Sequence, residues 1–325
     1  MTYKLDLKDK KILYELSINS RQSFNELAKK TRLNKNSIAY RINNLQKVGI
    51  IKKFHALIDV TKLGYLVFKL SLNFQNTTPQ KEKEIIDFLK AKDMVSWLAS
   101  IEGSYNIEAI IISKSMVEIN FLWEELMRNY ANYLPNRKLT LVSRAFYFSN
   151  SYFLKKTNKH KTEFISKPEK VEIDNIDLKI LQILCNDGRA RVIDLASKLN
   201  LTPKTIITRI KELESKKVIV GYKPTIDIKN LDYTIYNMVF MLHNLSEEKR
   251  NGLKYYISEH PNIIYYYEKI GSDEDIDIEL QVSGFLELKS ILNDIKAKFS
   301  DVIREYRIME ISEKQKSRFI PLLKD

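Results

Sequence analysis

The sequence predicts an α+β protein made of two copies of one unit, each with a helical part followed by a mixed part of strands and helices. Residues 5–65 align without a gap with residues 173–233, at a constant offset of 168, and 20 of these 61 positions are identical. A repeat of this length corresponds to a pair of domains rather than to a solenoid unit. Within each copy, apolar residues first recur at helical spacing and then alternate at strand spacing.

The helical part of the first copy is expected to contain three helices. The first begins near Asp6 or Asp9, whose carboxylates favour a helix start. The second covers about residues 23–31 and opens with Ser23 and Glu26, the spacing of a capping box. A tight connection separates it from the third.

The third helix is expected over residues 35–47, and its counterpart in the second copy is expected over 203–215. Two helices joined by a short turn, the second of them amphipathic and polar outside, are typical of helix-turn-helix domains. The strand-like runs that follow would form the short hairpin of a wing. Residues 1–60 and 173–230 are therefore predicted to be winged helix-turn-helix domains.

The outer face of each third helix carries hydrogen-bonding side chains and little acid, which suits base edges in a major groove. Arg41 and Arg209 lie about 60° from the apolar stripe, so they make either phosphate contacts or ion pairs within the domain. With the lysines of the following strand, the predicted DNA-binding residues are Lys35, Asn36, Ser37, Tyr40, Arg41, Asn43, Asn44, Lys47, Lys52, Lys53, Lys204, Thr205, Thr208, Arg209 and Lys211.

The charge distribution supports a polyanionic partner. The chain has a net charge of +13, of which residues 1–60 contribute +8 through 13 basic and 5 acidic residues. Residues 231–325 carry 13 basic and 17 acidic residues, a balance of −4. Lysine also serves only to solvate a surface, but its concentration in one domain favours nucleic acid binding. We expect the first copy to dominate contact with phosphates.

The mixed parts are predicted over residues 61–152 and 231–325. In the first, Phe68 and Leu70 alternate with Lys69 and Ser71, which predicts a half-buried strand. The element order β-α-β-β-α-β, with a glycine turn between the middle strands, is that of a ferredoxin-like unit. Residues 153–172 are predicted to be a basic linker. It would serve as a solvated spacer or, as the less favoured alternative, would add a contact with phosphates.

This order of elements, together with the residues at 5–13, 33–51 and 59–65 and the turn at Gly103, resembles the Lrp/AsnC family. These are the leucine-responsive and asparagine-operon regulators of bacteria and archaea. The resemblance implies a DNA-binding transcriptional regulator whose sensor domains pair sheet to sheet into dimers. It also implies larger homo-oligomers and a response to amino acids or similar small effectors at the interfaces between sensor domains.

The resemblance also suggests where an effector would bind. The family's glycine turn usually carries an aspartate three residues after the glycine, and a carboxylate there would hold an ammonium group. The first copy has Asn106 at this place, whereas Asp275 or Glu274 would serve in the second. The alternative is that the glycines only permit a tight turn. The predicted effector-binding residues are Gly103, Tyr105, Asn106, Gly271 and Asp275.

The chain departs from the family because it carries both units. One chain would supply a pair of sensor domains, and the molecule would be a covalent pseudo-dimer with two different recognition helices. Because operator symmetry mirrors protein symmetry, we expect it to bind an asymmetric operator in double-stranded DNA.

Several other classes are disfavoured by the sequence. A single cysteine, Cys185, excludes an intramolecular disulfide framework, and the four histidines show no metal-binding spacing. We expect no metal, no cofactor and no enzymatic activity. A branch of the same fold superfamily decarboxylates sirohaem, but its histidine-containing motifs are not found here. No secretory segment or run of 18 apolar residues is visible, so a cytoplasmic location without membrane contact is expected.

Two alternatives for function stay open at this point. One is an architectural DNA-binding protein without an effector. The other is a protein that binds DNA through its first copy only, with the second copy serving as an interaction module.

Overall fold

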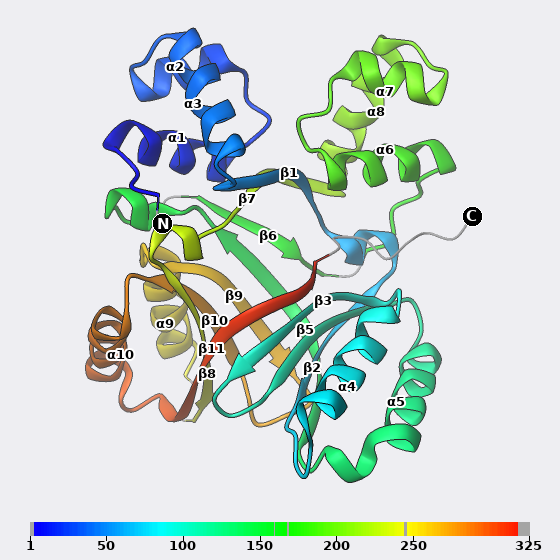
Figure 1. Ribbon diagram of the computed structural model, residues 1–325, viewed down its shortest axis with the longest axis vertical. Helices are drawn as coiled ribbons and strands as arrows, with labels where there is room; N and C mark the ends of the chain where they lie inside the picture. The colour runs from blue at the N-terminus through cyan, green and yellow to red at the C-terminus, as the bar shows by residue number, and fades with distance from the viewer. Residues whose placement is uncertain (1–2, 159, 168, 244–245, 318–325) are drawn as a thin grey trace.

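The computed structural model describes residues 3–158, 160–167, 169–243 and 246–317 (Figure 1). The helices and strands of the first copy are α1 (Leu7–Ile18), α2 (Phe24–Thr31), α3 (Lys35–Lys47), β1 (Ile51–Ile58), β2 (Leu66–Leu72), α4 (Pro79–Ala91), β3 (Val95–Glu102), β4 (Ile107–Ser113), α5 (Met116–Tyr130) and β5 (Arg137–Phe148). Strand β6 (Lys161–Ile165) follows. Those of the second copy are α6 (Asn175–Asn186), α7 (Val192–Leu199), α8 (Pro203–Ser215), β7 (Ile219–Ile226), β8 (Thr234–Leu242), α9 (Glu247–Glu259), β9 (Ile263–Ile270), β10 (Ile276–Val282), α10 (Phe285–Phe299) and β11 (Ile303–Ser317).

The predicted helix starts are confirmed by their caps. Asp6 is the N-cap of α1 and forms a capping box with Asp9, and Ser23 forms another at α2. Thr202 caps α8, with Pro203 at its first position, where the missing N–H costs nothing. These signals are local, so the sequence alone is sufficient to place them.

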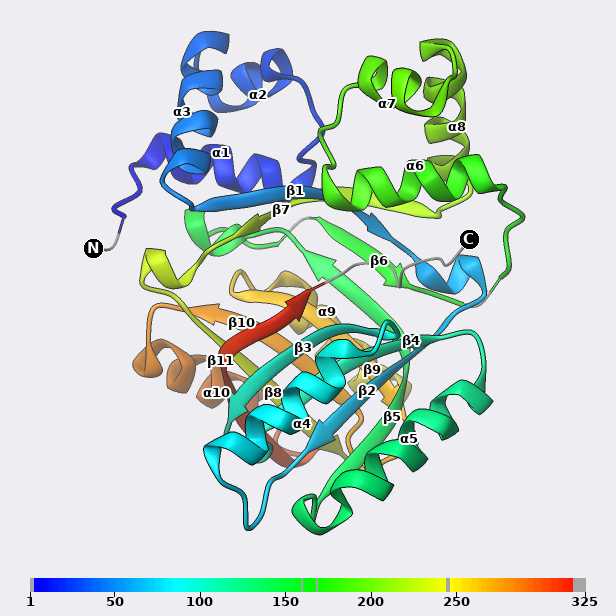
Figure 2. The ribbon, with the colours of Figure 1, turned by 45° about the vertical axis from the view of Figure 1, so that its right-hand side comes forward.

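The sensor strands of both copies close into one ring. The strand order is β2-β4-β3-β11-β8-β10-β9-β5, and β5 also pairs with β2. Each copy keeps the ferredoxin-like order, and the copies join where β3 pairs with β11 and β9 pairs with β5. The expected pairing of the two sensor domains therefore occurs within one chain, through strand edges. Helices α4 and α5 cover one side of the ring, and α9 and α10 cover the other (Figures 1 and 2).

Strand β2 is buried on both faces, although alternation predicted a half-buried strand. Phe68 and Leu70 pack beneath the helices of the first copy. Lys69 points into the ring and is only 6% exposed. The prediction was wrong because closure of the ring encloses the polar face as well, and the polar residues there pair with each other.

The predicted wing hairpin is absent from the described residues, since β1 pairs with β7 of the other copy instead. The pairing is antiparallel and sets His55 opposite Lys223. The resulting two-stranded ribbon lies between the helix-turn-helix domains and the ring (Figure 2). Each strand thus satisfies its backbone hydrogen bonds with the equivalent strand of the other copy.

The predicted linker contains ordered structure rather than only a solvated spacer. Strand β6 extends the sheet by pairing with β5, and Ile165 at its end is buried. Asn158 is also buried, and its side-chain amide donates to the carbonyls of His260 (2.6 Å) and Ile263 (3.2 Å). Pro168 lies outside the described residues. In the ranges that the structure covers, no helix combines the length and hydropathy needed to span a bilayer.

Candidate nucleic-acid interface

Helices α3 and α8 are held by apolar stripes that leave their outer faces exposed. Ile38 and Leu45 of α3, and Ile206 of α8, are completely buried. Asn34 caps α3 by accepting from the Ser37 N–H at 2.7 Å. Tyr40 is 73% exposed on the opposite side. The phenol of Tyr40 is therefore accessible to a partner.

The structure sorts the predicted DNA-binding residues into two groups. The exposed ones are Lys35, Asn36, Tyr40, Asn43, Lys47, Lys52, Lys204, Thr208 and Lys211. The partly buried ones are Ser37, Arg41, Asn44, Lys53, Thr205 and Arg209. The first group lies mainly on the outer faces of α3 and α8, as helical spacing predicts.

The two repeated arginines form ion pairs within their own domains. Arg41 contacts Asp6 at 2.9 Å and Asp9 at 2.6 Å. Arg209 contacts Asp174 at 2.8 Å and Asp177 at 2.9 Å. Each arginine thus links the recognition helix to the start of the first helix of its domain. An ion pair within the domain was one of the two roles expected for these arginines.

The lysines at the start of β1 are less available than the sequence suggested. Lys52 pairs with Asp227 at 3.0 Å. Lys53 is partly buried, and burial lowers its pKa. Lys53 belongs to ribbon strand β1 and is therefore less accessible to a phosphate than the exposed lysines of α3.

The two helix-turn-helix domains are joined by a reciprocal junction that sequence reasoning missed. The Ser20 N–H donates to the Tyr222 carbonyl at 2.8 Å, and the Gly188 N–H donates to the Phe54 carbonyl at 2.9 Å. Arg21 also donates to the Gly188 carbonyl at 2.7 Å. Each domain is thus anchored on the ribbon strand of the other copy.

Arg189 completes this junction by donating to the carbonyls of Ser20 and Gln22. The only signal in the sequence was the identity of Arg21 and Arg189 in the repeat. Because the junction is built from backbone contacts in both directions, it fixes the two recognition helices relative to each other. Figure 1 shows both domains at the same end of the molecule.

The glycine turns have structural partners in both copies. Gly103 and Gly271 adopt positive φ of 136° and 95°. Asn106 accepts from the Phe74 N–H, and Asp275 accepts from the Leu242 N–H, both at 2.8 Å. Asn106 and Asp275 are therefore equivalent, and one extra residue precedes Asp275. Effector binding at these turns stays a prediction.

Glu274, the other carboxylate considered for this role, instead links the copies. It accepts from the Tyr105 hydroxyl at 3.0 Å and pairs with Lys269 at 2.7 Å and Lys138 at 3.0 Å. Burial acts to raise its pKa, but the two lysines outweigh it and lower the pKa to about 2. Tyr105 also lines an open pocket with Trp123 and Arg307 beside the first turn.

Comparison with known proteins identifies the class of the helical domains. The winged helix-turn-helix DNA-binding family model matches residues 5–52 and 173–220. Together with the exposed outer faces of α3 and α8, this match defines a winged helix-turn-helix DNA-binding protein.

The regulator Ptr1 of Methanocaldococcus jannaschii is 32% identical over 143 residues, which cover 44% of this chain and 94% of Ptr1. The regulator LrpA of Pyrococcus horikoshii is 33% identical over 107 residues, 33% of this chain and 74% of LrpA. The chain belongs to the Lrp/AsnC family of transcriptional regulators, as a tandem duplication of the family's two-domain unit. The duplication explains why relatives align along most of their own length but along less than half of this chain.

A solved structure shares the two-copy architecture. The siroheme decarboxylase NirDL superposes with a TM-score of 0.65 over 98% of this chain and 94% of that chain, at 13% sequence identity. At this identity the similarity concerns the fold.

Salt dependence should reveal which lysines contact phosphate. Replacing Lys35 and Lys47 with alanine is expected to reduce the slope of log binding constant against log salt by about 1.8, because each phosphate contact contributes about 0.9. The matched pair Lys52→Ala and Lys53→Ala should change it less, since one lysine is ion-paired and the other partly buried. Fluorescence anisotropy on a DNA duplex measures both slopes, and equal changes would contradict the assignment.

Proposed function

We propose that this chain is a sequence-specific transcriptional regulator that places α3 and α8 in the major groove of one asymmetric operator. The observation that carries the proposal is the reciprocal junction, because it holds two different recognition helices in one fixed arrangement. Tyr40 and Asn43 would read one half-site, and Thr208 and Lys211 the other.

The differences between the two outer faces support an asymmetric site. The first offers the phenol of Tyr40 and the amide of Asn43, whereas the equivalent positions of the second offer a hydroxyl and an ammonium group. Amides suit adenine edges and lysine suits guanine. Two half-sites of different sequence are therefore expected, whereas a two-chain dimer of identical subunits binds a palindrome.

The test is selection of bound fragments from random DNA at about 0.15 M salt, where non-specific binding is weakened. The full chain is compared with Tyr40→Ala/Asn43→Ala and with Thr208→Ala/Lys211→Ala. The proposal predicts a two-part motif from which each variant loses one part. The matched control is Asn251→Ala/Tyr255→Ala on α9, which removes an exposed tyrosine and an exposed asparagine far from the recognition helices and should keep the full motif.

The other outcomes separate the alternatives. A one-part motif that only the first variant loses would make the second copy an interaction module. Binding without any enriched motif would indicate an architectural protein. A perfectly palindromic motif would contradict the asymmetric arrangement.

The proposal includes a small effector, such as an amino acid, at the glycine turns between the sensor domains, and a cytoplasmic site of action on DNA. It includes no catalytic step, in keeping with relatives that are transcriptional regulators. Association into larger homo-oligomers through the sensor domains is also part of it.

A further inference from the structure

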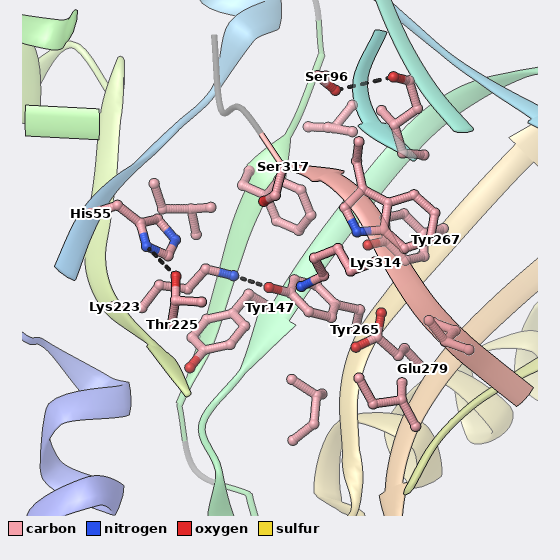
Figure 3. Close-up of a pocket in the computed structure, with 18 of the residues that line it drawn as sticks. His55, Ser96, Tyr147, Lys223, Thr225, Tyr265, Tyr267, Glu279, Lys314 and Ser317 are labelled. Atoms are coloured by element: carbon pink, nitrogen blue, oxygen red, sulfur yellow. Dashed lines mark hydrogen bonds between the residues drawn. The ribbon is translucent and has the colours of Figure 1, made fainter. Parts of the chain in front are cut away.

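A cavity of about 240 Å³ lies between the β1–β7 ribbon and the interior of the ring (Figure 3). The ribbon contributes His55 and Lys223 to its wall, and the ring strands contribute Tyr265 and Glu279. The cavity is distinct from the pocket beside the first glycine turn, since the two share no lining residue.

The two copies place chemically different side chains at two equivalent positions of this cavity. Trp97 of the first copy stands where the second has Tyr265, at the repeat offset. Ile110 pairs with Lys69 on β2, whereas its counterpart Glu279 pairs with Asn237 on β8. At these positions the first copy supplies the apolar side chains of Trp97 and Ile110, with Ile112 also in the lining, whereas the second copy supplies Tyr265 and Glu279.

Lys223, on ribbon strand β7, is a buried cation in the lining of the cavity. Its side chain is almost completely buried, with 5% of the residue exposed. The ammonium group donates to the Tyr265 hydroxyl and lies 4.4 Å from the ring centroids of both Tyr147 and Tyr265. Among the residues that the structure describes, no carboxylate forms an ion pair with it. Burial lowers its pKa to about 7, as expected for a buried cation without a full counter-charge.

The neighbouring charges compensate Lys223 only in part. Lys69, deeper in the ring, is matched by Glu108 at 2.9 Å and Asp277 at 2.6 Å. Glu279 faces the cavity; burial raises its pKa, and the charges of Lys314, Lys223 and Lys69 act to lower it. Lys314 adds a second ammonium group to the lining. Apart from the paired Lys69, the lining thus holds two ammonium groups, those of Lys223 and Lys314, and only the carboxylate of Glu279 to balance them.

We propose that this cavity binds a small organic carboxylate with an apolar body, its carboxylate against Lys223 and its body against Trp97, Ile110 and Ile112. The volume is below the roughly 300–1,000 Å³ of pockets for drug-sized ligands, so the expected ligand is smaller than those. A charge-assisted hydrogen bond in a buried site supplies the affinity for the head group.

The position of the cavity allows a bound ligand to affect the DNA-binding domains. Both domains are anchored on the ribbon, and the ribbon forms one wall of the cavity. A ligand there contacts the element that sets the arrangement of the recognition helices. This regulatory consequence rests on the function proposed above. Binding of the carboxylate is tested without DNA, so its failure can be distinguished from failure of the proposed function.

The two tryptophans of the chain provide a site-specific readout. In Trp123→Phe the remaining indole is Trp97 in the cavity, and in Trp97→Phe it is Trp123 beside the first glycine turn. The full chain is titrated with 3-phenylpropanoate. Phenylalanine, which adds an ammonium group to this acid, and the neutral 3-phenylpropanamide are titrated for comparison. We expect a saturable change in Trp97 emission, and we expect the amide to bind at least about tenfold more weakly than the carboxylate.

Substitutions in the Trp123→Phe background test the head-group contact. Lys223→Met should raise Kd for the carboxylate at least about tenfold. Lys217→Met, an exposed lysine of the same copy outside the cavity, should leave Kd unchanged. Glu279→Gln provides a second variant if Lys223→Met fails to fold. It should not weaken the carboxylate and should remove any preference for phenylalanine.

Three results would overturn the proposal. The first is that neither acid gives a saturable change in Trp97 emission at millimolar concentration. The second is a change in Trp123 emission alone, which would place the ligand at the glycine turn. The third is that folded Lys223→Met binds the carboxylate as tightly as the parent does.

Discussion

Replacing Lys69 with methionine is expected to lower the free energy of unfolding by about 3–5 kcal/mol, the cost of removing one partner from a buried ion pair. Lys69 lies inside the ring between Glu108 and Asp277, and both carboxylates are almost completely buried. Burial acts to lower the pKa of Lys69, but the two carboxylates outweigh it and hold the pKa above its ordinary value. The substitution leaves two buried carboxylates with less compensation.

Urea unfolding followed by circular dichroism measures this effect. The control is Lys81→Met, which breaks an exposed pair with Glu84 on α4 and should leave the unfolding midpoint unchanged. Adding Glu108→Gln to the Lys69 variant should recover part of the loss, since one uncompensated charge disappears while Asp277 keeps its ion pair with Lys269 at 2.7 Å. A Lys69→Met protein as stable as the parent would show that the pair is not isolated from water.

Replacing Gly188 with alanine is expected to lower the free energy of unfolding by about 1–3 kcal/mol through overpacking. An added Cβ would lie 2.8 Å from the carbonyl carbon of His55 and 2.9 Å from its Cα and nitrogen. These are backbone atoms of β1, so the helix-turn-helix domain must move instead. Because this contact positions the second domain, operator affinity should fall together with stability.

The matched control is Gly252→Ala on α9. Its Cβ would meet only Phe299, at 3.8 Å, so the substitution should raise the free energy of unfolding by roughly 0.5–1 kcal/mol through better helix propensity. Thermal unfolding of the two variants should therefore shift in opposite directions. Shifts in the same direction would contradict the assignment of Gly188 to a backbone contact.

The features that could be predicted from the sequence are those determined by interactions between residues close together in the chain. The caps at Asp6, Ser23 and Thr202, and the buried stripes of the recognition helices, depend on contacts inside one turn or one domain. The intramolecular pairing of the sensor units followed from the repeat itself. Even the ion pairs of Arg41 and Arg209 were among the expected roles, because their angle to the apolar stripe kept them off the outer face.

The failures concern partners that are far apart in the chain. Lys69 alternates with apolar residues as an exposed side chain would, but its partner Asp277 is 208 residues away. Likewise, β1 meets β7 across the repeat, and no local turn signal announces such a pairing. Lys223 and Glu279 were not singled out at all. A signal for them existed, namely a change of polarity at equivalent positions, with Ile110 in one copy and Glu279 in the other.

The closed ring has a consequence for how this regulator exists in a cell. A dimer of separate subunits falls apart on dilution and can exchange subunits with related proteins. Here β3 meets β11 and β9 meets β5 at the effective concentration set by covalent connection, on the order of millimolar for short linkers, however dilute the protein is. The pair of recognition helices should therefore exist at any protein concentration, and mixed dimers with other family members should not form by exchange of single units.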